Sequence, residues 1–95
     1  MTDANVAIDE AEQDDARYRD IWRSLSGAAR ETLHCLFKCG PTYDGNVPSK
    51  SGRDELLDKK LAVKMCMAKG EQGFQACTYL GSRVWRRGQE LRGAN

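Results

Sequence analysis

Cysteine and histidine are the residue types in this sequence with the widest range of chemistry. The chain has four cysteines and one histidine, which are Cys35, Cys39, Cys66, Cys77 and His34. Structural zinc sites usually take thiolates in pairs that are roughly two to four residues apart. Only the first pair of cysteines comes near that spacing, although a hairpin that pairs Cys66 with Cys77 would leave a four-thiolate site or a disulfide open as alternatives. We predict instead that the cysteines are small buried thiols, reduced and without a metal.

These residues give little support for a catalytic function. His34 and Cys35 are neighbours in a predicted helix, where consecutive side chains point about 100° apart and cannot pair as base and nucleophile. The sequence has no glycine-rich phosphate loop, no triad motif and no pair of carboxylates arranged for acid–base catalysis. We therefore expect a protein that is not an enzyme and that needs no cofactor.

Charge is distributed unevenly along the chain. Residues 1–15 carry six acids and no lysine or arginine, whereas residues 16–95 carry eight acids against 15 lysines and arginines, an excess of seven positive charges. This asymmetry indicates a body that binds a polyanion and an acidic tail; the alternative is an ordinary solvated surface with a disordered tail. Because no secretory signal and no apolar run near the ~20 residues of a membrane span is present, we expect a cytoplasmic protein without membrane contact.

The length of 95 residues fits one domain with a single core. Residues 1–13 lack a sustained apolar period, so we expect an acidic disordered tail there and one domain over residues 14–95. From Asp15 onward, apolar residues follow helical spacing at Tyr18, Ile21, Trp22 and Leu25. This pattern predicts the first helix.

A second helix is predicted over residues 27–39. Ser26 would cap it, and Gly40 followed by Pro41 would end it. Residues 41–48 contain two prolines and an Asp-Gly turn, which is typical of a loop.

The rest of the chain predicts a helix, a hairpin and a last helix. Ser51 and Asp54 have the spacing of a capping box for a third helix that ends near Lys60. Apolar residues then alternate with polar ones on both sides of a Gly-containing turn, which predicts a β-hairpin at about 62–78. Thr78 is placed to cap the last helix.

This order of helix, helix, loop, helix, hairpin and helix resembles the winged helix–turn–helix family, in particular its MarR-like regulators, over about residues 26–90. Two runs carry the resemblance: Gly52–Lys64 is similar to a recognition helix entering the first strand of the wing, and Cys77–Val84 is similar to the end of the wing. The resemblance implies a mainly α fold with a β-hairpin wing, and a DNA-binding transcriptional regulator of bacterial or phage type. Because the family has a short helix where this sequence has the loop 41–48, the helix–turn–helix is expected to be abbreviated.

Double-stranded DNA is the first partner that the resemblance implies. A recognition helix lies in the major groove with its N-terminal residues near the base edges, and the wing touches flanking phosphates. The residues that would make these contacts are Ser49, Lys50, Ser51, Arg53, Lys64 and Lys69. Against this hypothesis, the outward side of the third helix carries Asp54, Glu55, Asp58 and Lys59, and its acids would be repelled by phosphates.

Protein binding is therefore the second hypothesis. A winged helix could use the acidic side formed by Asp54 and Asp58 as an adaptor surface, with Trp85 as an exposed contact unless it packs against the first helix. The resemblance also implies a homodimer through the terminal helices. In that case the basic group of the last helix would serve the interface or pair with the acidic tail; its members are Arg83, Arg86, Arg87 and Arg92.

Overall fold

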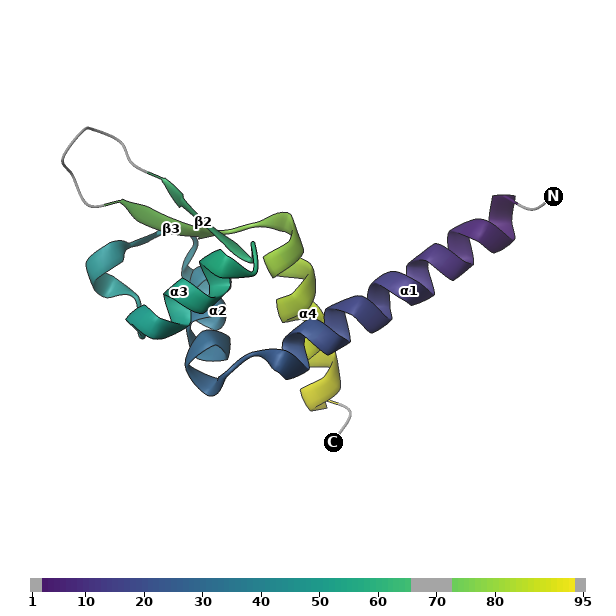
Figure 1. Ribbon diagram of the computed structural model, residues 1–95, viewed down its shortest axis with the longest axis horizontal. Helices are drawn as coiled ribbons and strands as arrows, with labels where there is room; N and C mark the ends of the chain where they lie inside the picture. Colours follow the sequence, from purple (N-terminus) through teal and green to yellow (C-terminus); the bar gives the residue numbers. More distant parts are fainter. Residues whose placement is uncertain (1–2, 66–72, 94–95) are drawn as a thin grey trace.

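The computed structural model describes residues 3–65 and 73–93, with side chains from Asp14 onward (Figure 1). Within these ranges four α-helices pack with a small antiparallel sheet of three strands, so the prediction of a mainly helical fold with a hairpin is confirmed. The elements are α1 (Asp3–Ser24), α2 (Gly27–Cys39), β1 (Thr42–Tyr43), the 3-10 turn η1 (Asp44–Asn46), α3 (Lys50–Asp58), β2 (Ala62–Met65), β3 (Phe74–Cys77) and α4 (Tyr79–Gly93).

Helix α1 is longer than the sequence pattern predicts. We expected residues 1–13 to be disordered, but the helix already begins at Asp3. Its first half contains good helix formers without glycine or proline, and acids near a helix N-terminus are favoured by the helix dipole. This half projects from the body (Figure 1), so the radius of gyration is 15.2 Å where a compact chain of this length has about 12 Å.

Helix α2 follows its prediction and lies at the centre of the fold. Ser26 caps it by accepting a hydrogen bond from the backbone N–H of Ala29 at 3.1 Å, and Gly40 ends it with a φ of 76°. Helices α3 and α4 both pack against α2. Leu33 and Leu36 are fully buried between them, so α2 supplies much of the core.

The segment predicted as a loop contains two short elements. Strand β1 pairs antiparallel with β3, where Thr42 lies opposite Gln75 and Tyr43 opposite Phe74. The turn η1 then follows β1 and precedes α3. A strand of two residues is too short to produce an alternating pattern, which is why the sequence did not reveal it.

Helix α3 starts earlier than expected. Ser49, and not Ser51, is its cap, because the Ser49 hydroxyl accepts a hydrogen bond from the backbone N–H of Gly52 at 3.0 Å. The helix ends at Asp58, and Lys60 has a positive φ of 65° before the chain enters β2.

The predicted hairpin is confirmed in the described strands β2 and β3. Its register places Cys77 opposite Ala62, so the described strands do not have the direct pairing with Cys66 that the alternatives of a disulfide or a four-thiolate site assumed. Cys66 itself lies outside the described residues. The strands alternate between two faces. One face looks toward the core through Ala62 and Gln75, and the other is the outer face, formed by Tyr43, Val63, Met65, Phe74 and Ala76.

Helix α4 closes the core. The Thr78 hydroxyl accepts a hydrogen bond from the backbone N–H of Gly81 at 3.0 Å, as its predicted role as a cap requires. At the crossing with α1, Gly88 lies directly against the indole of Trp22, so any side chain at Gly88 would collide with that ring. No helix in residues 3–65 or 73–93 has the length and apolar character that crossing a membrane needs.

Candidate nucleic-acid interface

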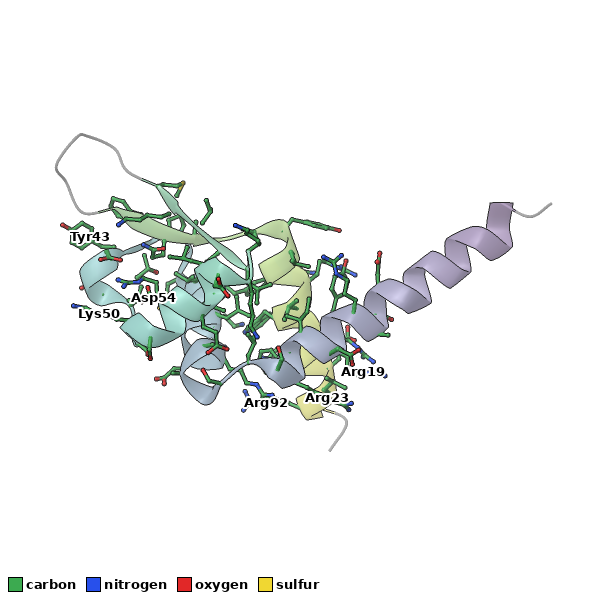
Figure 2. All side chains as sticks on the ribbon, in the orientation of Figure 1. Arg19, Arg23, Tyr43, Lys50, Asp54 and Arg92 are labelled. Carbon is green, nitrogen blue, oxygen red and sulfur yellow. The ribbon has the colours of Figure 1, made fainter. Side chains whose placement is uncertain are left out.

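The first turn of α3 presents only part of the predicted DNA-contacting set. Lys50 and Ser51 are exposed, and Figure 2 shows Lys50 at the outer end of the helix. Ser49 is half-buried, and its hydroxyl is engaged as the helix cap. Two of the four helix residues expected at DNA are therefore exposed at this end.

The side chain of Arg53 is mostly buried and forms ion pairs. Its side chain is 18% exposed, and its Nη1 lies 2.8 Å from Oδ1 of Asp44. Its Nη2 lies 2.9 Å from Oδ1 of Asp54. The same Asp44 oxygen accepts a hydrogen bond from Nε2 of Gln75 at 3.0 Å. Asp44 of η1 thus joins Arg53 of α3 to Gln75 of β3. We name the group Asp44, Arg53, Asp54 and Gln75 the η1–α3 cluster.

The electrostatics of the η1–α3 cluster favour the ionised forms of Asp44 and Arg53. Partial burial acts to raise the pKa of Asp44, but hydrogen bonding to Arg53, the charge of Arg53 and the hydrogen bond from Gln75 together hold it below its ordinary value. The pKa of Arg53 is raised, first by its hydrogen bond with Asp54. Sequence reasoning missed Asp44 and Gln75, because the only signal from Asp44 was that of an Asp-Gly turn and Gln75 comes from a distant strand.

The outer side of α3 is less charged than its sequence suggests. Asp54 and Asp58 are exposed as expected, but Glu55 turns toward α2. Its carboxylate accepts hydrogen bonds from the backbone N–H and hydroxyl of Ser26 at 3.0 and 2.8 Å, and the backbone bond is the main reason why its pKa is lowered. Lys59 likewise donates to the hydroxyl of Ser24 at 3.0 Å. The expectation that Glu55 and Lys59 point outward is therefore wrong, and both fasten α3 to the junction of α1 and α2.

The hairpin of β2 and β3 combines one described lysine with an apolar surface. Lys64 is exposed on β2, whereas Lys69 lies outside the described residues. On the outer face, Tyr43, Val63 and Met65 are 39%, 46% and 41% exposed. The described part of the hairpin is therefore more apolar than a surface that binds only phosphates.

Trp85 is a core residue. It is 8% exposed, stacks on Phe37 with ring centroids 3.9 Å apart, and donates a hydrogen bond from Nε1 to Nδ1 of His34 at 3.2 Å. The expectation of an exposed tryptophan contact is wrong, because Trp85 is buried against Phe37 and His34 of α2. The ring also belongs to one core cluster with Tyr18 and Trp22 of α1.

Three of the four arginines of α4 have partners within the chain. Arg83 lies over the ring of Tyr18 and Arg86 over that of Phe37. Arg87 forms an ion pair of 2.9 Å with Glu90. A role for these arginines in an interface stays a prediction.

The cysteines differ in their surroundings. Burial raises the pKa of Cys35, and it raises that of Cys77 to about 11. Cys39 is exposed, so the expectation that the thiols are buried is wrong for this residue. Over the described part of the chain, no three His, Cys, Asp or Glu side chains are grouped as metal ligands.

Comparison with known proteins identifies no relative of this chain. No protein-family model matches the chain, and neither a curated protein nor a solved structure matches it significantly.

Proposed function

We propose that the chain is a winged-helix DNA-binding module, acting as a small transcriptional regulator, that contacts the phosphate backbone with the first turn of α3 and with the wing. The order of its elements supports this proposal, because the turn η1 lies between α2 and α3 and a hairpin follows directly, as the order of a winged helix–turn–helix requires. The third strand β1 attaches the turn to that hairpin. Helix–turn–helix proteins place the second helix in the major groove with its N-terminal end at the bases.

The observation that carries the proposal is the exposed first turn of α3 on a rigidly held helix. Lys50 and Ser51 extend from a turn whose orientation is fixed by Arg53 through Asp44 and Gln75. Arg53 is thus a positioning residue in this proposal and does not read bases. With few exposed donors on α3, phosphate contacts supply most of the affinity, and sequence preference is weak.

The test is a fluorescence anisotropy titration of a labelled duplex at two salt concentrations. Replacing Lys50 or Lys64 by alanine should weaken binding to all sequences alike and lower the salt slope by about one unit each. Arg17→Ala is the matched control, since Arg17 is an exposed arginine on α1 away from α3. Equal losses in the control and in Lys50→Ala would overturn the proposal.

Protein binding is a second candidate function, because α3 carries an exposed acidic surface. Asp54 and Asp58 are exposed on α3, and Figure 2 shows Asp54 at the same end of the molecule as the exposed Tyr43. This surface suits a partner protein with a basic surface around an apolar contact.

Asp58→Lys separates the two functions. If α3 faces DNA, the reversed charge removes repulsion and raises the affinity for nonspecific duplex several-fold, by roughly the effect of two phosphate contacts. If α3 faces a protein, the affinity for duplex does not change. Asp58 suits this test better than Asp54, whose loss would disturb Arg53.

A further inference from the structure

A groove lies on the side of the molecule formed only by α1, α2 and α4. It has a volume of about 550 Å³, and its lining includes Trp22, Arg30, Glu31, His34, Gln89 and Arg92. No residue of α3 or of the sheet, among those described, lines it. Its size falls in the range of sites for small molecules, which is roughly 300–1,000 Å³.

Arg30 is fixed in this groove before any ligand binds. Its Nε and Nη2 donate to the backbone carbonyl of Trp22 at 3.2 and 3.0 Å. Its guanidinium carbon lies 4.8 Å from the centre of the Trp22 ring. These contacts use one side of the guanidinium, so its Nη1 retains donors in a position that is already ordered.

Two neutral side chains add further donors. Because Nδ1 of His34 accepts the hydrogen bond from Trp85, the neutral ring carries its proton on Nε2, on the other side of the imidazole. Nε2 of Gln89 is buried and donates to no described residue. A buried amide without an acceptor is costly, so a ligand oxygen that accepts from it would bind favourably.

The donors in the groove outnumber the acceptors. Arg92 is exposed in the last turn of α4, and Figure 2 shows it at the lower edge of the molecule. The only acid in the lining is Glu31. Guanidinium groups bind oxyanions through paired hydrogen bonds, and a phosphate monoester offers several oxygens that only accept. A carboxylate offers only two oxygens and one negative charge, so a phosphate monoester with three terminal oxygens is the better match for donors from four side chains.

We propose that this groove binds the phosphate group of a phosphorylated small molecule of nucleotide size. Arg30, Arg92, His34 and Gln89 donate to the phosphate, and Glu31 limits the affinity by repulsion. The inference does not depend on the proposed DNA-binding surface, which lies on α3 and the wing. A nucleic-acid backbone carries the same group, so the experiment must separate the two sources.

The experiment is a calorimetric titration of the full chain with AMP, inorganic phosphate, adenosine and a short DNA duplex. We expect one AMP per chain, weaker binding of phosphate and none of adenosine. Arg92→Glu should weaken AMP about tenfold or more, since it replaces a charged donor by an acid. Glu31→Gln should strengthen AMP binding by about two- to fivefold, an effect that a merely structural role for Glu31 would not produce.

Two controls keep the result interpretable. Arg17→Glu makes the same change in net charge on an exposed part of α1 and should alter AMP affinity by less than about twofold. Lys50→Ala should affect the duplex and not AMP, so a failure of the DNA-binding proposal is seen separately. Arg92 is exposed, so Arg92→Glu should leave the melting temperature unchanged.

Each outcome of these titrations either supports or overturns the proposal. If AMP does not bind but Arg92→Glu and Glu31→Gln change duplex affinity in opposite directions, the groove binds phosphate and the source is nucleic acid. The site is overturned if adenosine binds as tightly as AMP, if none of the phosphate-bearing probes binds at ~10 mM, or if the two groove variants leave every affinity unchanged.

Discussion

Asp44 and Arg53, nine residues apart in the sequence, form an ion pair of 2.8 Å between Oδ1 and Nη1. The pair fastens the turn before α3 to the helix itself, and Gln75 extends the connection to the sheet. Arg53, which the sequence analysis placed among the DNA-contacting residues, is therefore part of the support of the helix. Under the proposed function, a variant of Arg53 should change DNA binding through the position of α3.

Asp44→Asn should reduce stability in a pH-dependent manner. The pKa of Asp44 is lower in the folded protein than its ordinary value of 3.8. Its ionised form therefore stabilises the fold fully above about pH 4, and this contribution is lost as the pH falls through the folded-state pKa. In urea titrations, the difference between native protein and variant should be constant near neutral pH and shrink below about pH 4. A difference that grows with acid would contradict the ion pair.

Gly88→Ala should destabilise the crossing of α1 and α4. A methyl group at Gly88 would collide with the indole of Trp22, and overpacking of this kind costs about 1–3 kcal/mol. Gly93→Ala is the matched control, because nothing lies near a side chain at that position. It should change the free energy of unfolding by less than about 1 kcal/mol, in the stabilising direction. Equal effects of the two variants would show that Trp22 does not lie against Gly88.

The cysteines should react at different rates. With a pKa of about 11, Cys77 is about 0.1% thiolate at pH 8, and the thiolate is the reactive form. Exposed Cys39 should be alkylated first by iodoacetamide, and Cys77 last. Mass spectrometry of timed digests measures the order, in a Cys66→Ser background. Alkylation of Cys77 as fast as Cys39 in folded protein would contradict its burial.

Deletion of residues 1–13 should leave the fold intact. The buried residues of α1 begin at Tyr18, among those whose side chains are described, so the core keeps its contacts. The melting temperature should change by only a few degrees. Affinity for duplex DNA should rise because four acids are removed. An unchanged affinity would exclude competition by the acidic segment without affecting the fold.

Local signals predicted most of the elements. Ser26 and Thr78 cap the helices that their sequence context indicated, and the change from helical to alternating spacing after Leu61 marks the start of the hairpin. Such features depend on residues within a few positions of each other, so a single sequence contains them. Strand β1 was missed because its two residues acquire their structure only by pairing with β3.

The candidate site was harder to predict, because its side chains contact residues that are distant in the sequence. Arg53 was predicted to contact DNA, and nothing local indicated that Asp44 and Gln75 would hold it. Trp85 lies off the apolar stripe of α4, and its burial depends on Phe37 and His34 of another helix. Periodicity describes one element at a time and cannot state which faces of two elements meet.

The sheet has two edges, and each is protected against joining the sheet of another molecule. One edge is β1, which has only two residues and offers too little backbone to template a further strand. The other edge is β2, where Lys64 interrupts the apolar residues Ala62, Val63 and Met65. A charged lysine on an edge strand opposes the stacking of identical chains that leads to amyloid-like aggregates. Lys64 therefore lowers the tendency of the protein to aggregate edge to edge, whichever ligand the molecule binds.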